Sequence, residues 1–149
     1  MSMTRQQKQN QALANEALLR AAIAAGGVGN EINAVFSRVG ALGPAHSVEF
    51  DAPTIAPIKS GQFLVMFNIS GTDATPSDTI TAVLGRGLTS LLTETFAVGA
   101  DAAGTWFYSV TFLDESGGGG IYKLTLTSNT PANITVPANH GCVQVIEQP

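Results

Sequence analysis

Few residues in this sequence have the types and the spacing that a catalytic site needs. His140 and Cys142 stand two positions apart in a predicted strand, so their side chains could share one face and pair a thiol nucleophile with a base. Nothing else in the sequence supports such a pair. Cys142 is the single cysteine and lies close to valine and isoleucine residues, which favours a small, buried, structural thiol. A single cysteine also excludes a disulfide within the chain.

Metal and cofactor sites have equally little support. Asp73 and Asp78 lie in a stretch rich in turn-forming residues, where their carboxylates could bind calcium, but the further spaced oxygen ligands of a calcium loop are missing. His46 and His140 are far apart, and the sequence contains no phosphate-binding loop and no nucleophile-elbow motif. We therefore expect no metal, no cofactor and no enzymatic activity.

Two aromatic residues, Trp106 and Tyr122, could each stack against a sugar ring. Both occur in alternating strand patterns, however, and aromatic side chains in such patterns usually fill a protein interior. The sequence therefore favours a position in the core for both residues.

The elements that would hold these residues are strands, and the segment of residues 60–70 (SGQFLVMFNIS) is the most informative of them. Its apolar residues occupy both faces of an extended strand. Phe63, Val65, Phe67 and Ile69 share one face, and Leu64 and Met66 share the other. A strand that is apolar on both faces is covered on both. We expect a second sheet to cover one face and another subunit to cover Leu64 and Met66.

Six further segments have the length and composition of strands, and turn-forming residues separate them. They are residues 79–84, 88–98 (with a bulge), 105–113, 121–127, 133–136 and 141–147. In residues 105–113, Phe107 lies on the face opposite Trp106, and we place it at the subunit interface with Leu64 and Met66. With one or two edge strands in residues 43–60, the total is about eight strands, which predicts an all-β sandwich or barrel.

The N-terminal segment predicts helices. Residues 4–25 are rich in Gln, Ala and Leu and end at Gly26-Gly27, and a second short helix is expected from Asn30 to Val39. Heptad spacing runs through both helices, and its seam contains Leu18, Val28, Ile32, Val35 and Val39. β-Branched residues at both kinds of seam position favour trimers, so we expect a three-stranded coiled coil. The alternative is a pair of amphipathic helices packed on their own domain.

Charge distinguishes two expected domains, a helical attachment and oligomerisation segment in residues 1–45 and a β head in residues 46–149. The first segment carries more basic than acidic residues, whereas the head is acidic. Arg5, Lys8 and Arg20 could therefore attach the protein to an acidic surface of a larger particle, although a solvated helix would carry the same charges.

The composition limits the class of partner. Hydrophobic residues make up 44% of the chain and charged residues 12%, against roughly 25% charged residues in typical soluble domains. This favours surface that is buried between subunits. The net charge of −4 argues against nucleic acid. No stretch approaches the roughly 20 apolar residues of a membrane span, and the first residues do not resemble a signal peptide.

Several motifs resemble the strands of a known family. Residues 61–65 (GQFLV) open one strand, and residues 121–126 (IYKLTL), 133–136 (NITV) and 142–147 (CVQVIE) close the chain. Together they resemble the trimeric jelly rolls of the tumour-necrosis-factor and complement-head type, above all those of bacteriophage head fibres, head spikes and capsid decoration proteins. The resemblance covers residues 47–147 and rests on strand order and strand ends. It implies a jelly-roll head on a threefold axis, attached through its N-terminal segment, and it carries no catalytic residue.

Sequence and resemblance together predict a non-enzymatic virion structural protein. We expect a homotrimeric capsid decoration or head-fibre protein that binds capsid or tail proteins, is assembled in the host cytoplasm, and contacts neither nucleic acid nor membrane. The alternative is a receptor-binding tail or fibre module that recognises host-cell surface glycans through residues 71–78, 99–104 and 114–120. A cupin-like metalloenzyme is a third class, since cupins share the jelly-roll architecture, but two distant histidines form a poor ligand set.

Overall fold

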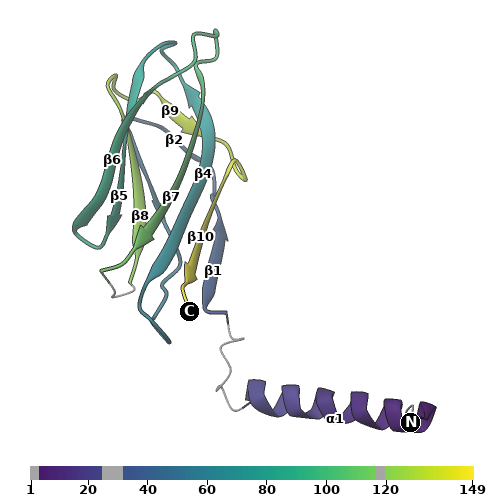
Figure 1. Ribbon diagram of the computed structural model, residues 1–149. Coiled ribbons are helices and arrows are strands. Elements are labelled where there is room, and N and C mark those ends of the chain that lie inside the picture. The colour runs from purple at the N-terminus through teal and green to yellow at the C-terminus, as the bar shows by residue number, and fades with distance from the viewer. Residues whose placement is uncertain (1–3, 25–31, 117–119) are drawn as a thin grey trace. The chain divides into compact units, whose positions relative to one another are not determined.

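The computed structural model describes residues 4–24, 32–116 and 120–149 (Figure 1). The chain divides into two compact units, residues 1–32 and residues 33–149. The first unit contains helix α1 (Arg5–Ala24), and the second is a β-sandwich. A β-sandwich with an N-terminal helix is the fold class that the sequence predicted.

Helix α1 begins with a capping box. The backbone N–H of Gln7 donates to Thr4 Oγ1 at 3.2 Å, and the backbone N–H of Thr4 donates to Gln7 Oε1 at 2.9 Å. These two bonds satisfy amide groups that have no partner inside the helix. The described side chains of α1 are all exposed, including those of Leu13 and Leu18. The sequence of the helix therefore caps its N-terminus, but the helix buries none of these side chains within its unit.

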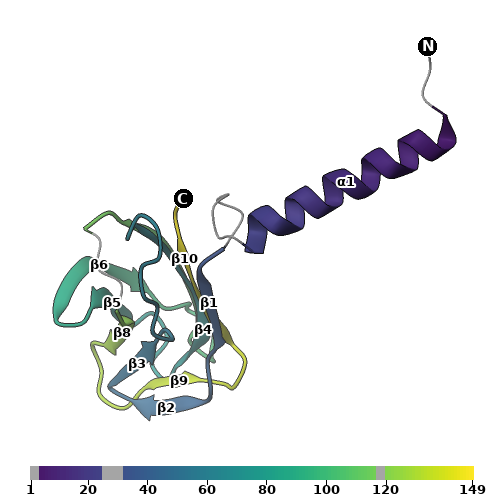
Figure 2. The same ribbon diagram turned by 90° about the horizontal axis from the view of Figure 1, so that it is seen from below.

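The sandwich consists of two antiparallel sheets, whose layers are clear when the molecule is seen from below (Figure 2). The first sheet contains β1 (Ala34–Arg38), β10 (Gly141–Glu147), β4 (Phe63–Asp73) and β7 (Thr105–Asp114) side by side, with β9 (Ile134–Val136) and β2 (Leu42–Ala45) beyond the end of β10 along β4. The second sheet contains β3 (Ser47–Asp51), β8 (Tyr122–Ser128), β5 (Thr79–Arg86) and β6 (Thr89–Ala97).

The connections give the sandwich its jelly-roll topology. The chain passes from β3 in the second sheet to β4 in the first, returns for β5 and β6, and then crosses for β7, β8 and β10 in turn. Eight strands arranged as β1-β10-β4-β7 and β3-β8-β5-β6 form the two facing sheets of a jelly roll. A register shift in the β5–β6 pair, after Leu84, corresponds to the bulge that the sequence predicted in residues 88–98.

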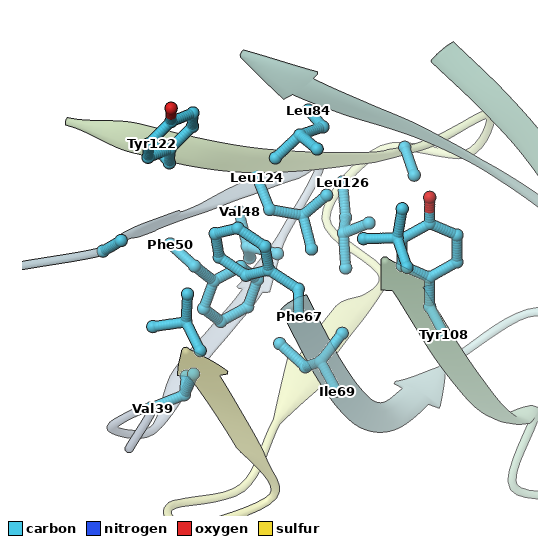
Figure 3. Close-up of a cluster of buried hydrophobic side chains, with 14 of the residues drawn as sticks. Val39, Val48, Phe50, Phe67, Ile69, Leu84, Tyr108, Tyr122, Leu124 and Leu126 are labelled. Carbon is cyan, nitrogen blue, oxygen red and sulfur yellow. The ribbon is translucent and has the colours of Figure 1, made fainter. Parts of the chain in front are cut away.

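The core lies between the two sheets and follows from the alternation of side chains along the strands. In β4 the residues Phe63, Val65, Phe67 and Ile69 are buried, as predicted. Figure 3 shows Phe67 and Ile69 beside side chains of the opposite sheet, among them Val48 and Phe50 of β3 and Leu124 and Leu126 of β8. Trp106 and Tyr122 also belong to this core, at 4% and 0% exposure, which confirms the structural interpretation of both.

The predicted second helix and its coiled coil are wrong. Residues 34–38 form strand β1, which pairs with β10 from Ala34↔Ile146 to Arg38↔Cys142. Val39 follows the strand and is buried in the sandwich core, and Val35 is half-buried against it. Residues four apart can share a face in a strand as well as in a helix, so the spacing of Val35 and Val39 did not distinguish the two. Pairing with the free edge of β10 satisfies the backbone N–H and C=O groups of residues 34–38, and this segment is therefore a strand.

The boundary between the two parts also differs from the expected one at residues 45/46. The compact units meet after Ile32, and residues 34–45 contribute β1 and β2 to the sandwich. Asn33 is the first residue tied to the sandwich by its side chain, which donates to the carbonyl of Ala56 at 2.8 Å and to Glu147 Oε2 at 3.3 Å. The jelly roll therefore begins about a dozen residues earlier than its strand patterns indicated.

Candidate functional site

The outer face of the first sheet is the surface that the sequence analysis singled out. Directly paired residues of antiparallel strands point to the same side, so the register defines rows across this face. One row contains Ala34, Ile146, Leu64 and Leu113, and the next contains Phe36, Gln144, Met66 and Thr111. Because Phe63 and Val65 of β4 point into the core, Leu64 and Met66 point outwards, as predicted.

Large apolar side chains gather in these two rows, which we call the apolar end of the face. Phe36 is 56% exposed and Leu113 is 43% exposed, while Leu64, Met66 and Ile146 are half-buried. Their neighbours in the rows are Ala34, Gln144 and Thr111, none of which carries a charge. Single exposed apolar residues are ordinary, but a contiguous group on one sheet face marks an interaction surface.

The outer face of the second sheet is different in kind. Its outward rows are dominated by threonine and serine, and their hydroxyl groups bond across the strands, at 3.0 Å between Ser47 and Thr127 and 3.3 Å between Thr81 and Thr95. Lys123 forms an exposed ion pair with Glu49 at 3.6 Å on the same face. This face is suited to water, which makes the apolar character of the opposite face specific to that surface.

A shallow depression lies beyond the apolar end on the outer face of the first sheet. Its volume is about 380 Å³, and its lining includes Arg38, Asn68, Ser70, Phe107, His140 and Cys142. The register explains why they meet: Arg38 pairs with Cys142 and Cys142 with Asn68, and in the next row Ser70 pairs with Phe107. Four strands from four distant parts of the sequence therefore build one site.

Hydrogen bonds hold the polar side chains of the depression. Ser109 Oγ donates to Asn68 Oδ1 at 2.6 Å, Ser70 Oγ lies 3.4 Å from His140 Nδ1, and the backbone N–H of Ser70 donates to the carbonyl of His140 at 2.9 Å. Phe107 is 66% exposed at its rim. Among the described residues that line the depression there is no Asp or Glu.

The pairing of His140 with Cys142 does not form a catalytic arrangement. The ring contact that the structure gives to His140 is with Ser70, and no acidic residue lines the depression to orient the imidazole. Cys142 was expected to be buried, but it is half-buried on the outer face, where it lines the depression, because the inward positions of β10 are those of its neighbours Gly141 and Val143. The site can bind through hydrogen bonds, one aromatic ring and positive charge, but it has no activated nucleophile.

Asp73 and Asp78, the weak calcium candidates, are both buried and meet at one hydroxyl. Ser128 Oγ lies 2.7 Å from Asp73 Oδ2 and 2.9 Å from Asp78 Oδ2. Burial alone would raise the pKa of Asp78, but hydrogen bonds from Thr130, Ser128 and Thr79 together lower it. Within residues 4–24, 32–116 and 120–149, no three His, Cys, Asp or Glu side chains gather to hold a metal ion. The two carboxylates tie the loop after β4 to the end of β8.

Asp114 is the centre of a second buried polar cluster. Its carboxylate pairs with the Arg86 guanidinium and accepts from Tyr122 Oη at 2.6 Å and from Ser116 Oγ at 2.5 Å. Burial alone would raise the pKa of Asp114, but the hydrogen bonds from Ser116, Tyr122 and Arg86 outweigh it and lower that pKa. The cluster joins β5, β7 and β8 through side chains from all three strands.

The predicted interface residues fall in different places. Leu64 and Met66 lie in the apolar end, whereas Phe107 lies on the same face but at the depression. Leu18 is exposed on α1, and Ile32, the last residue of the first unit, is exposed as well. Val35 and Val39 belong to the sandwich, and Val28 lies outside the described residues. Of the predicted attachment residues, Arg5 and Lys8 are exposed on α1, and Arg20 belongs to the same helix.

Sequence reasoning missed the depression itself. By sequence, Arg38 belongs to the basic N-terminal segment of residues 1–45, and Asn68 and Ser70 belong to the end of a strand. His140 is indicated only as a partner of Cys142. The one indication in the sequence was the aromatic Phe107 on a strand face where the next two residues, Ser109 and Thr111, are polar. That Arg38 lies near these residues depends on the order of the strands in the sheet.

Comparison with known proteins adds little to this geometry. No protein-family model matches the sequence, and no curated protein matches it. Among solved structures, the fold is similar to the C-terminal CBM6 of LamC, a marine laminarinase from Zobellia galactanivorans, with 13% identity and a TM-score of 0.36 over 78% of this chain and 100% of that chain. At this level the likeness carries no argument about function. In the described part of the chain, α1 is not apolar enough along its length to span a membrane.

Proposed function

We propose that this protein is a non-enzymatic structural protein whose copies associate through the apolar end of the outer face of the first sheet. The observation that carries the proposal is the charge distribution. Among the outward residues of β1, β10, β4 and β7, Arg38 alone carries a formal charge, and it stands at the end away from Leu64 and Leu113. Copies that each carry a net charge of −4 repel one another least through such a face.

The size of the face fits this role. Four strands about 4.8 Å apart and about nine residues long, at about 3.4 Å per residue, give a face on the order of 500 Å² before side-chain relief is counted. A standard interface takes about 800 Å² from each partner. The apolar end is only part of this face, so a contact of standard size through it must also take in a neighbouring edge of the sandwich.

We further propose that the assembly is a homotrimer in a bacteriophage virion, a capsid decoration or head-fibre protein. Three copies and the virion setting follow from the family resemblance in residues 47–147, and the jelly-roll topology agrees with that family. Helix α1 supports attachment to a particle, because its exposed Leu13 and Leu18, with Arg5 and Lys8 towards its start, offer an unpartnered surface. In proteins most of the stability of a helix comes from packing against a partner.

The test is the mass of the purified protein by size-exclusion chromatography with light scattering. Wild type should be trimeric, and Met66→Glu, which places a carboxylate in the apolar end of each copy, should weaken association by at least about 100-fold, since like charges at an interface repel strongly. Thr95→Glu is the matched control, because Thr95 is exposed on the outer face of the second sheet. A variant that lacks residues 1–32 should keep the mass of three sandwiches.

A monomeric wild type would contradict the proposal directly. Equal dissociation by Met66→Glu and Thr95→Glu would show that the assembly does not use the apolar end. Loss of assembly on removal of residues 1–32 would transfer the oligomerising role to α1 and refute the assignment to the sheet.

A further inference from the structure

The depression on the outer face of the first sheet has features that self-association does not require. Trp106 and Tyr108, the neighbours of Phe107 along the chain, point into the core, whereas the Phe107 ring is 66% exposed. An aromatic ring offers a flat apolar surface against which a ligand can stack. Phe107 also stands apart from the apolar end, because the row of Asn68 and Ser109 separates it from Met66 and Thr111.

Unused hydrogen-bond donors surround this ring. The Asn68 side chain accepts from Ser109 Oγ through Oδ1, which directs its amide N–H groups away from that contact. His140 faces Ser70 through Nδ1 and keeps Nε2 for another partner. Among the described residues, none forms a hydrogen bond or ion pair with the Arg38 guanidinium. The site therefore offers mainly donors and requires a ligand rich in acceptors.

Charge narrows the class of ligand further. The net charge of the chain is −4, yet the depression is lined by Arg38 and His140 and by no carboxylate. A guanidinium is well shaped to bind a carboxylate through two parallel hydrogen bonds. A ligand that satisfies both ends of the site thus has an apolar face for Phe107 and a carboxylate for Arg38.

We propose that the depression binds an acidic saccharide, a sugar that carries a carboxylate. The apolar C–H face of one ring packs on Phe107, its hydroxyl oxygens accept from Asn68 and His140, and the carboxylate pairs with Arg38. Such a ligand combines a flat apolar face, many acceptors and a negative charge, whereas free phosphate has nothing for Phe107 to contact.

The dimensions of the sheet set the size of the ligand. Arg38 lies on β1 and Phe107 on β7, with β10 and β4 between them, so their backbones are about 14 Å apart across the sheet at about 4.8 Å per strand. Both side chains extend over the depression and shorten this distance. With a volume of about 380 Å³, the site has room for one or two sugar rings.

The experiment measures binding to the full chain by calorimetry and by NMR shifts, with probes in matched pairs: 3′-sialyllactose against lactose, and digalacturonate against its dimethyl ester. Inorganic phosphate is measured as well, to show whether a small anion binds without a sugar ring. We expect at least one acidic sugar to bind with a Kd of about 1 mM or tighter and its neutral match at least about tenfold more weakly. Phe107→Ala should weaken the acidic sugar about tenfold, and Arg38→Gln should remove the preference for the acidic form.

Two control variants keep the result specific. Leu88→Ala removes an exposed apolar side chain at the turn between β5 and β6, and Arg5→Gln removes an exposed positive charge on α1; both should bind as wild type does. Thermal unfolding verifies that each variant is folded, and if Phe107→Ala is not, Asn68→Leu replaces it.

Absence of binding by every sugar would overturn the proposal, as would equal affinity for acidic and neutral forms or binding of phosphate as tight as that of the sugars. If Phe107→Ala instead dissociates the assembly, the depression is a contact between subunits and the saccharide site is refuted. The mass measurements described above decide the proposed function separately, so that either proposal can fail alone.

Discussion

Replacing Asp114 by Asn tests whether a buried charge, and not only apolar packing, holds the two sheets in place. Asp114 is 1% exposed at the end of β7, and it binds Arg86 of β5 and Tyr122 of β8. The substitution keeps the size of the side chain but removes its charge and turns one acceptor oxygen into a donor. Arg86 and Tyr122 both bind Oδ2, so an amide nitrogen in place of Oδ2 faces two donors, one of them the completely buried Tyr122, whereas one in place of Oδ1 faces the backbone N–H of Ser116.

The expected loss follows from the partners. Removing one member of a buried ion pair lowers the free energy of unfolding by about 3–5 kcal/mol. The Arg86 side chain is 21% exposed, so water recovers part of its interaction and we expect the lower figure, about 3 kcal/mol. Tyr122→Phe, which leaves Asp114 bound to Arg86 and Ser116, should lose about 1.5 kcal/mol. Glu49→Gln, at the exposed ion pair with Lys123, should lose at most about 0.5 kcal/mol.

The assay is equilibrium unfolding in urea at fixed protein concentration, followed by fluorescence of Trp106. This residue is the single tryptophan and is 4% exposed in the core, so it reports on the sandwich. For a domain of this size, a loss of about 3 kcal/mol corresponds to a fall in Tm of roughly 10–15 °C.

The pH dependence gives a second check with a definite sign. Because the pKa of Asp114 is lowered in the folded state, its contribution to stability is fully present above the unfolded value of about 3.9 and is lost as pH falls through the folded pKa. The difference between wild type and Asp114→Asn should therefore shrink as the pH is lowered from 7 to below about 4. A loss no larger than that of Tyr122→Phe, or a difference that does not depend on pH, would refute this reasoning.

Two further predictions concern other contacts that hold loops to the strands of the sandwich. Burial alone would raise the pKa of Glu147, but hydrogen bonds from the backbone amides of Lys59 and Ile58, at 2.6 and 2.7 Å, and from the Asn33 side chain lower it. Glu147→Gln should therefore speed hydrogen exchange at those two amides, and unchanged exchange relative to Glu49→Gln would contradict this. The stability that the Glu147 carboxylate provides should be lost as pH falls through its lowered pKa. Gly104→Ala should destabilise the protein far more than Gly87→Ala in thermal unfolding. Both glycines have a positive φ (61° and 57°). A Cβ at Gly104 would lie 1.9 Å from the carbonyl oxygen of Asp73, however, whereas one at Gly87 would meet nothing within 4 Å. We expect a loss of about 1–2 kcal/mol at Gly87 from backbone strain alone, and equal losses at the two positions would show that the loop before β7 can move away from β4.

The strands that are most regular in sequence were predicted well, because the period of two is a local property that survives whatever the strand pairs with. The segment predicted at residues 141–147 coincides with β10, and the alternation in residues 121–127 gives the buried face of β8 correctly. The same local pattern placed Leu64 and Met66 opposite Phe63 and Val65. It could not show that Asp73 and Asp78 share the hydroxyl of Ser128, which comes from a strand 50 residues later.

The error in residues 30–39 has the opposite cause. A short segment with apolar residues at Ile32, Val35 and Val39 fits a helix or a strand about equally well by itself. Its state depends on whether a partner is available for its backbone groups, and β10 offers a free edge at the matching register. No residue near position 35 contains that information.

By itself, then, the sequence determined that this is a mainly β chain with an N-terminal helix, a strand that is apolar on both faces and a low content of charged residues. The tertiary structure alone decided which side chains became neighbours on the outer face: that Leu64 lies between Ile146 and Leu113, and that Arg38, Asn68, His140 and Phe107 surround one depression. The physical reason is that alternation along a strand is set by local backbone geometry, whereas the order of strands is set by hydrogen bonds between segments that are far apart in the chain.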